Sequence, residues 1–288
     1  MKYKELGKTG VLVSELALGT WRYDGGVQAL QAGLDLGANF IDTAEAYGSE
    51  EVVGRAIIGK RLEVFVATKV LPRNFKRRDI IRAAEQSLKR INTDYIDLYQ
   101  LHWPNYTVPI AETMAAMEEL VESGKVRFIG VSNFSVGEME EAQAALSKSK
   151  IVSNQVQYSL IDRAIEHGLL QHCESNGITI LAFSPLAAGL ANIREWDCDD
   201  TLGRIAAEVG KTRAQVALNW CVRHHSVTAI FKANQIQHIR ENCAASGWSL
   251  SPVHVGALER VPHRRRGRIG GFARRVRRYC LQRIGRNI

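Results

Sequence analysis

The sequence predicts a (β/α)8 TIM barrel, a fold in which eight parallel strands alternate with helices in one domain. From Leu16 to about Ile230, short apolar or β-branched runs alternate with longer segments of helical period. Eight such runs occur, and eight parallel strands with eight crossovers close most naturally into a barrel. The length of 288 residues agrees, because such barrels commonly exceed about 250 residues as a single domain.

The first expected element is a β-hairpin over Tyr3–Ser14. The stretch YKELGKTGVLVS alternates in polarity and turns at GKTG. Since it precedes the first barrel strand, we expect it to lie across the bottom of the barrel and close it.

The eight expected barrel strands are short and rich in β-branched or large apolar residues. They are LALGT (16–20), NFID (39–42), VFVATK (64–69), IDLYQLH (96–102), VRFIGVS (126–132), VSNQVQ (152–157), ITILAFS (178–184) and VTAIF (227–231). Helical segments lie between them. In one, apolar residues recur at three and four residues from Met114 to Val121, and Gly124 stands at a C-cap position. A doubly wound sheet is the alternative, weakened because no GxGxxG follows an early strand.

Composition is that of an ordinary globular protein, with 45% hydrophobic and 24% charged residues. The five cysteines are odd in number and scattered, without metal-ligand spacing, so we expect reduced thiols and no metal site. Charge and glycine interrupt the N-terminal segment before any run long enough for a signal peptide or a membrane span. The expected location is the cytoplasm, and the expected assembly is a monomer or weak oligomer.

The net charge of +8 comes from the C-terminal end of the chain. From His263 onward, HRRRGRIGGFARRVRRYCLQRIGRNI holds ten arginines and no Asp or Glu, so the rest is slightly acidic. We expect the barrel domain to span residues 1–251 and a basic C-terminal extension to span residues 252–288.

Three interpretations of this extension stay open. The first is an amphipathic helix packed on the barrel with its arginines in solvent. The second is attachment to an anionic surface, either membrane lipid or nucleic acid. The third is an end without a function of its own. The apolar stripe of the expected helix comprises Ile269, Phe272, Val276, Tyr279 and Cys280.

Four polar residues lie at the carboxyl ends of three consecutive expected strands or in the loop that follows one of them. Asp42, Lys69 and His102 each close a strand, and Tyr47 lies in the loop after Asp42. In a barrel the carboxyl ends of all strands face one mouth, so these side chains should converge there. Each residue alone could be structural, as a turn cap, a snorkelling lysine, a satisfied histidine or a half-buried aromatic. The set of four favours catalysis.

The chemistry of the four residues fits proton donation to a carbonyl group. A lysine at a buried strand end stays charged beside the carboxylate of Asp42. The ammonium group of Lys69 should lower the pKa of the Tyr47 phenol and make it a general acid. His102 could donate to a carbonyl oxygen that gains negative charge.

Six segments resemble the aldo-keto reductases in their order, spacing and barrel position. The resemblance is to prokaryotic-type members that reduce aldehydes or 2,5-diketo-gluconate with NADPH. The segments are DTAEAYG (42–48), ATK (67–69), LHWP (101–104), GVSNF (130–134), NQVQYS (154–159) and FSPLAAG (183–189). The resemblance runs from Tyr3 to about Ser251. It implies hydride transfer from a nicotinamide cofactor to an aldehyde or ketone while Tyr47 donates the proton. Asp42 and Lys69 would tune Tyr47, and His102 would position the carbonyl.

The same resemblance implies a nicotinamide site at the barrel mouth. Ser132, Asn133 and Gln155 would hold the carboxamide, and Tyr158 would stack on the ring. The alternative is that these polar residues simply terminate buried strands.

At the adenosine end, the resemblance implies that Lys232 contacts a 2′-phosphate. Asn234 and His238 would flank that phosphate, and Glu241 and Asn242 would contact adenine. The charge of a lysine at this place favours NADPH, with NADH possible.

The pyrophosphate between the two ends would contact Ser184 and Leu186. No metal is implied. The complete set of implied cofactor residues is Gly19, Thr20, Asp42, Ser132, Asn133, Gln155, Tyr158, Ser184, Leu186, Lys232, Asn234, His238, Glu241 and Asn242.

For the substrate, the resemblance implies that Trp21 and Trp103 wall the pocket beside Tyr47 and His102. The loop Pro104–Pro109 is short, so we expect an open pocket for small aldehydes, dicarbonyls or sugar-derived ketones. A different class of function is an NADPH-binding regulatory or redox-sensing subunit with little turnover. The complete set of four catalytic residues favours the enzyme, and a nucleic-acid protein has only the basic tail in its favour.

Overall fold

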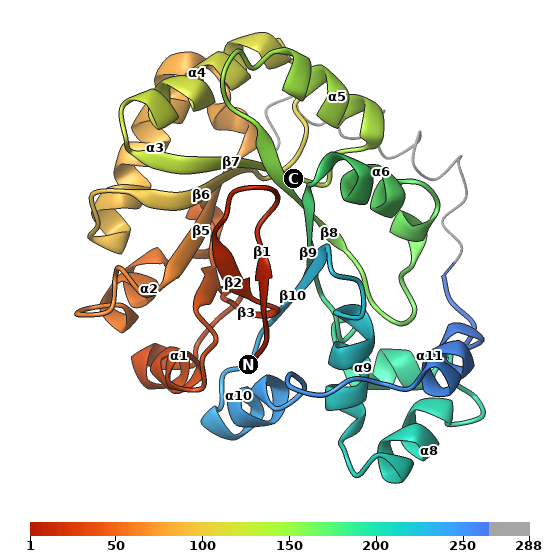
Figure 1. Ribbon diagram of the computed structural model, residues 1–288. Helices are drawn as coiled ribbons and strands as arrows, with labels where there is room; N and C mark the ends of the chain where they lie inside the picture. Colours follow the sequence, from red (N-terminus) through yellow and green to blue (C-terminus); the bar gives the residue numbers. More distant parts are fainter. Residues whose placement is uncertain (265–288) are drawn as a thin grey trace.

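In a computed structural model that describes residues 1–264, the protein is a closed barrel of eight parallel strands surrounded by helices (Figure 1). The strands follow chain order around the barrel, and β10 closes it against β3. They are β3 (Leu16–Gly19), β4 (Phe40–Asp42), β5 (Phe65–Val70), β6 (Ile96–Leu101), β7 (Val126–Ser132), β8 (Ile151–Gln157), β9 (Thr179–Phe183) and β10 (Val227–Phe231). The predicted (β/α)8 barrel is confirmed, and every predicted strand end agrees to within one residue.

Helices cover the outside of the barrel. Among the described residues they are α1 (Gly26–Asp35), α2 (Glu50–Ala56), α3 (Arg77–Ile91), α4 (Ile110–Glu122), α5 (Val136–Ala144), α6 (Leu169–Asn176), α7 (Leu190–Arg194), α8 (Thr201–Glu208), α9 (Arg213–Cys221), α10 (Ile236–Cys243) and α11 (Pro252–Glu259). Residues 1–264 also form three short 3-10 helices, η1 (Glu45–Tyr47), η2 (Pro72–Asn74) and η3 (Ala164–Glu166). In α4, Met114 and Met117 are fully buried, and Gly124 takes a left-handed φ of 72° just past the helix, as the periodicity predicted.

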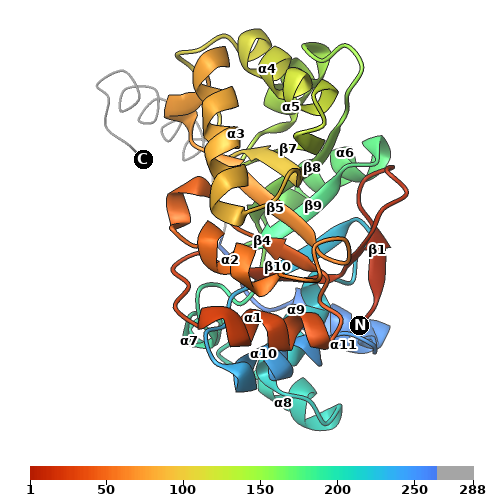
Figure 2. The same cartoon turned by 90° about the vertical axis from the view of Figure 1, so that its left-hand side faces the viewer.

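A hairpin closes the amino-terminal end of the barrel, as predicted (Figure 2). It pairs β1 (Tyr3–Glu5) with β2 (Leu12–Ser14) in antiparallel register. Leu6 and Val13, from the hairpin region, are fully buried in one cluster with the barrel-interior residues Phe40 and Phe65. Since apolar side chains fill this end, polar chemistry is confined to the carboxyl end of the strands.

The packed fold continues past the expected boundary at residue 251. Helix α11 packs against α8, and Leu258 is fully buried. Arg163, itself buried, donates hydrogen bonds of 2.8 Å to the carbonyl oxygens of Leu258 and Glu259. Helix α11 is therefore part of the barrel domain. The apolar stripe expected from Ile269 to Cys280 lies outside the described residues.

The described residues carry neither a membrane-spanning helix nor a metal cluster. No helix within residues 1–264 is long and apolar enough to cross a membrane. Within the same range, no group of three or more His, Cys, Asp or Glu could hold a metal ion. The cysteines of this part of the chain, Cys173, Cys198, Cys221 and Cys243, are free thiols.

Glu118 in α4 fixes the loop that follows α5. Its carboxylate accepts hydrogen bonds from the Ser147 hydroxyl (2.6 Å) and from the backbone N–H groups of Ser147 (3.0 Å), Lys148 (2.7 Å) and Ser149 (2.7 Å). These hydrogen bonds, that of the Ser147 hydroxyl first, lower the pKa of Glu118 to about 2. The carboxylate thus stabilises the folded state as long as it is ionised.

We expect Glu118→Ala to lower the free energy of unfolding by about 2 kcal/mol at neutral pH, since it removes hydrogen bonds to a charged group. The folded pKa lies below the unfolded value of about 4.3, so the contribution is complete above that value and is lost as the pH falls toward about 2. In urea titrations, the difference between the two proteins should therefore shrink from about pH 6 to about pH 3. A difference that stays constant over this range would contradict the assignment.

Candidate active site

The four residues expected to be catalytic lie together at the carboxyl end of the barrel. Asp42 ends β4, Lys69 lies on β5 and His102 directly follows β6, on three neighbouring strands. Tyr47 ends η1, the turn that follows β4. Lys69 is completely buried, Asp42 and His102 are nearly so, and Tyr47 is half-buried.

Lys69 is the centre of this group. Its Nζ lies 2.6 Å from Asp42 Oδ2, 2.8 Å from the carbonyl oxygen of Thr43 and 3.4 Å from the hydroxyl oxygen of Tyr47. That hydroxyl is also 3.4 Å from His102 Nε2, and the two rings meet edge to face at 5.6 Å. The Tyr47 hydroxyl is therefore held between an ammonium group and an imidazole.

The pKa of Lys69 is raised despite its burial. Burial is the largest single effect and lowers this pKa, but the Asp42 carboxylate and the Tyr47 hydroxyl together outweigh it. Lys69 therefore carries a positive charge at neutral pH.

The pKa of Tyr47 is also raised, which corrects our prediction that Lys69 would lower it. Burial of the phenol favours its neutral form, and this effect exceeds the opposing influence of the Lys69 charge. The depth of Tyr47 beneath the rim could not be judged from the sequence. As a result, Tyr47 holds its proton at neutral pH.

His102 is neutral at physiological pH. Burial first, and then the charge of Lys69, lower its pKa to about 3. Its Nδ1 atom is buried without a hydrogen-bond partner among residues 1–264, while Nε2 faces the Tyr47 hydroxyl. A neutral imidazole can donate one hydrogen bond without releasing charge into the site.

Two glutamines hold the second oxygen of Asp42, and Gln100 was not among the predicted residues. Gln155 Nε2 donates to Asp42 Oδ1 at 2.7 Å, and Gln100 Nε2 lies 3.4 Å from the same oxygen. In the β5–β6 register, Gln100 stands directly opposite Lys69. Its place in the site could have been predicted from the sequence, because Gln100 precedes His102 by two residues and residues at this spacing point to the same face of a strand.

Ser132 and Asn133 lie beside this group at the end of β7. The Ser132 hydroxyl donates to the carbonyl oxygen of Gln155 at 2.9 Å. Asn133 has a left-handed φ of 63°, and its Nδ2 donates to Ser132 Oγ (2.9 Å) and to the carbonyl oxygen of His102 (3.3 Å). The two residues and Gln155 thus converge on the mouth from β7 and β8.

Tyr158 does not occupy the position that was expected for it. Its ring is fully buried, 5.3 Å from the ring of Trp220. Its hydroxyl donates to Glu166 (2.6 Å) and accepts from Arg223 (2.7 Å). No ring face is open to a nicotinamide, so the stacking role does not fit. Phe183, which ends β9 and is partly exposed, is an aromatic side chain at the carboxyl end that the sequence reading missed.

The loop after β9 contains Ser184 and Leu186 and is conformationally unusual. Ser184, Ala187 and Ala188 have left-handed φ values of 52°, 55° and 62°. Left-handed backbone at residues other than glycine costs energy and clusters at ligand sites. The loop is therefore a candidate ligand-binding segment.

The residues expected at the adenosine end lie along β10 and α10. Lys232 is exposed directly after β10, and Asn242 is buried on α10. His238 is exposed, with Nδ1 3.4 Å from a carboxylate oxygen of Glu241. Within the described chain, the side-chain oxygen of Asn234 is buried without a hydrogen-bond partner.

The loop after β3 is tied to the catalytic group. Gly19 ends β3, and a Cβ added there would come within 2.8 Å of the Ile230 side chain. Thr20 Oγ1 donates to the carbonyl oxygen of Asp42 at 2.9 Å and accepts from Ser49 at the same distance. These bonds fix the start of the loop that carries the expected substrate residue Trp21.

Comparison with known proteins identifies the family. The model of the aldo/keto reductase family matches residues 15–262. The chain belongs to the aldo-keto reductases. It is 40% identical over 238 residues to methylglyoxal reductase YeaE of Escherichia coli (strain K12), covering 82% of this chain and 84% of that protein. This aldo-keto reductase is therefore an NAD(P)H-dependent oxidoreductase that acts on small carbonyl compounds.

Two further comparisons cover nearly the whole aldo-keto reductase chain. A crystal structure of an aldo-keto reductase from Klebsiella pneumoniae in complex with NADPH is 39% identical, with a TM-score of 0.85, and the match covers 92% of this chain and 96% of that one. A probable voltage-gated potassium channel subunit beta of Arabidopsis thaliana is 30% identical over 316 residues, covering 91% of this chain and 96% of that protein.

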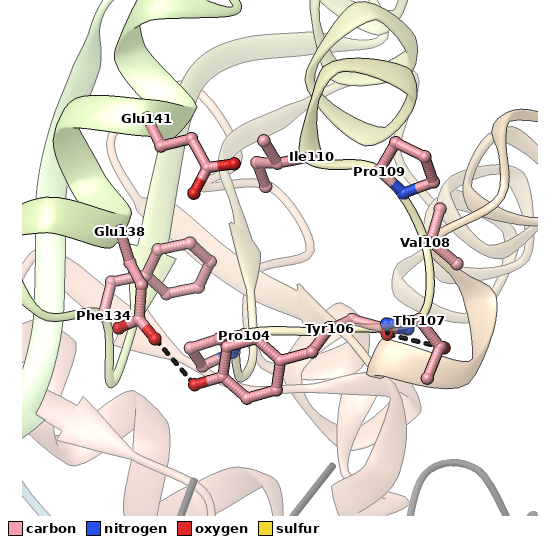
Figure 3. A pocket seen from close by; sticks show the side chains of 10 residues that line it. Pro104, Tyr106, Thr107, Val108, Pro109, Ile110, Phe134, Glu138 and Glu141 are labelled. Atoms are coloured by element: carbon pink, nitrogen blue, oxygen red, sulfur yellow. Dashed lines mark hydrogen bonds between the residues drawn. The ribbon is translucent and has the colours of Figure 1, made fainter. Parts of the chain in front are cut away.

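A pocket of about 380 Å³ lies at the rim of this aldo-keto reductase (Figure 3). The loop from Pro104 to Ile110 forms one wall, and Phe134 with two glutamates of α5 forms the other. Nearer the catalytic group, Trp103 stacks beside His102 with ring centres 6.2 Å apart. Trp21 is 52% exposed after β3. The residues that line the rim pocket include none of Tyr47, His102, Trp21 and Trp103, so this pocket is distinct from the substrate site expected beside them.

Proposed function

We propose that this aldo-keto reductase reduces small aldehydes and ketones to alcohols with NADPH, and that Tyr47 donates the proton. The observation that carries the proposal is the Lys69-centred group, in which one hydroxyl is within 3.4 Å of both an ammonium and an imidazole nitrogen. Carbonyl reduction needs one hydride at the carbon and one proton at the oxygen. When bound, the nicotinamide supplies the hydride.

The four side chains of this group have distinct roles. Tyr47 gives its proton to the oxygen as negative charge develops there. Lys69 stabilises the phenolate left behind, and Asp42 keeps the ammonium in place through the 2.6 Å ion pair. His102 is neutral and donates a hydrogen bond from Nε2 that positions the carbonyl oxygen. Bulk solvent then returns a proton to Tyr47 after the alcohol leaves.

The nicotinamide carboxamide is assigned to Ser132, Asn133 and Gln155 at the mouth. Because the side-chain nitrogen of Gln155 already donates to Asp42, its side-chain oxygen is the atom offered to the carboxamide. Ser184 and Leu186 are assigned to the pyrophosphate. The run of left-handed residues supports this assignment, since an ordered ligand would offset that strain.

The adenosine end is assigned to the segment after β10. The buried side-chain oxygen of Asn234 supports a ligand here, because unsatisfied buried acceptors are rare without one. Glu241 and Asn242 are assigned to adenine, and Lys232 to the 2′-phosphate with His238 beside it. The NADPH bound to the Klebsiella relative agrees with this choice of cofactor, and NADH remains a weaker alternative.

We expect Lys232→Gln to raise the Kd for NADPH by about tenfold to a hundredfold, because it removes one charge-assisted contact to a phosphate. The Kd for NADH, which lacks that phosphate, should change by less than about twofold. Titration of intrinsic fluorescence with each cofactor measures both values. Equal losses for the two cofactors would place Lys232 away from the 2′-phosphate.

The substrate class we assign is small aldehydes and dicarbonyls. The short loop Pro104–Pro109 and the exposed side chain of Trp21 support small substrates, and the similarity to a methylglyoxal reductase makes methylglyoxal the first compound to test. The test is loss of NADPH absorbance with methylglyoxal, other small aldehydes and sugar-derived ketones. NADPH loss that depends on a carbonyl compound supports the proposal, and none with any compound refutes it.

An NADPH-binding regulatory subunit is the second candidate. The likeness to a protein named as a potassium channel beta subunit supports it. The complete and well-formed catalytic group favours the enzyme. Tight NADPH binding without turnover of any carbonyl compound would favour the subunit instead.

A further inference from the structure

We propose that the rim pocket between the β6–α4 loop and α5 binds the arginine-rich segment 265–288 of the same chain. The contacts would form between guanidinium groups of the segment and the carboxylates of the pocket. This proposal goes beyond the carbonyl reduction proposed above and does not depend on it.

The pocket has the chemistry that a guanidinium group prefers. Glu138 and Glu141 lie one turn apart on α5 and line the pocket together with the rings of Phe134 and Tyr106 (Figure 3). Guanidinium groups pair with carboxylates through parallel hydrogen bonds and stack on aromatic faces. A volume of about 380 Å³ accommodates one or two arginine side chains.

One of the two carboxylates is held in place and the other is accessible. Glu138 accepts hydrogen bonds from the backbone N–H and hydroxyl of Ser135, both 2.7 Å, and from the Tyr106 hydroxyl at 2.6 Å. Glu141 is exposed on the same helix. The pocket therefore presents a fixed negative charge beside one that can adapt to a cation.

The described chain ends on the same rim of the barrel as the pocket. The backbone N–H of Arg264 donates to the carbonyl oxygen of Ile161 at 2.8 Å, and its guanidinium lies 3.5 Å from the buried carboxylate of Asp162. Both partners belong to the loop after β8. Strand β8 neighbours β7, whose carboxyl end leads into α5 and the pocket. The described chain therefore ends at Arg264, on the end of the barrel where the pocket opens.

Length and charge make this segment a fitting occupant. It contributes 24 residues, of which nine are arginines and none is Asp or Glu. An extended chain of that length spans up to about 80 Å, whereas the radius of gyration of a domain this size is about 18 Å. The rest of the chain is slightly acidic, so the intramolecular attraction has the correct sign.

Tail protection from trypsin tests the proposal, because trypsin cleaves after arginine. The full chain is digested briefly at about 50 mM and at about 500 mM NaCl. The higher salt concentration screens the contacts between arginine and carboxylate much more strongly. Mass spectrometry follows cleavage within residues 265–288, normalised to cleavage at sites in the barrel. We expect cleavage within the tail to be about tenfold slower at low salt, because cleavage follows the undocked population.

Two charge-reversal variants, one in the pocket and a matched one outside it, distinguish binding in the pocket from a general attraction between the basic segment and the acidic barrel. Glu141→Lys should remove the low-salt protection. Glu140→Lys makes the same change in charge one residue away, at a side chain 64% exposed beside His172, and should retain the protection. Equal tail cleavage in all three proteins at both salt concentrations would overturn the proposal. So would protection that appears only with phosphatidylserine vesicles or with single-stranded RNA, since the segment would then bind that partner.

Discussion

Tyr47→Phe should lower kcat by about a hundredfold to ten-thousandfold, the range for loss of a positioned general acid. The substitution removes one oxygen atom and leaves the ring in its edge contact with His102. The raised pKa of Tyr47 keeps the wild-type phenol protonated and able to donate at neutral pH. Steady-state rates with methylglyoxal measure the loss, and the Kd for NADPH should change by less than about twofold, because no cofactor contact is assigned to this hydroxyl.

The matched control for this variant is Tyr3→Phe. It removes a tyrosine hydroxyl that donates to the Gly37 carbonyl oxygen at the opposite end of the barrel. This control should retain the wild-type kcat. A Tyr47→Phe variant that keeps more than about a tenth of the wild-type kcat would refute Tyr47 as the proton donor.

Lys69→Met should destabilise the protein and abolish activity together. Lys69 is completely buried, and its loss leaves the buried carboxylate of Asp42 without its cation. Breaking one partner of a buried ion pair costs about 3–5 kcal/mol in the free energy of unfolding. Turnover should fall at least a hundredfold as well, since the phenolate of Tyr47 would lose its neighbouring positive charge.

The double variant Asp42→Asn/Lys69→Met separates stability from catalysis. It removes both charges, so urea unfolding should show recovery of most of the lost stability. Activity should not recover, because the ammonium group is still absent. A single Lys69→Met variant destabilised by less than about 1 kcal/mol would show that the ion pair is not needed for folding.

The barrel strands were predictable because each is a short apolar run bounded by polar segments, the pattern of a strand buried on both faces. The convergence of Asp42, Lys69 and His102 followed from the same reasoning, since strand ends in a barrel share one mouth. What the sequence could not supply was the depth of each side chain. That depth decides the direction of the Tyr47 pKa, which burial raises.

Two differences between prediction and structure arise from local geometry. Gln155 and Gln157 lie on β8 with a spacing of two, whereas Tyr158 follows the end of the strand and turns its ring toward Trp220 of α9. Proximity to a motif in sequence therefore did not place this ring in the mouth. The predicted end of the barrel domain at residue 251 came before α11. This helix is short and Leu258 is its sole fully buried side chain, so its sequence shows little helical periodicity of apolar residues.

The fate of the hydride tests the central claim most directly. The full-length wild-type protein is incubated with NADPH carrying deuterium at both C4 positions and with methylglyoxal, and the product is analysed by mass spectrometry. The account predicts one deuterium on the former carbonyl carbon of the alcohol for each NADPH consumed. If NADPH binds but no deuterated alcohol forms from methylglyoxal or any other carbonyl compound of the panel, the protein is not the reductase proposed here.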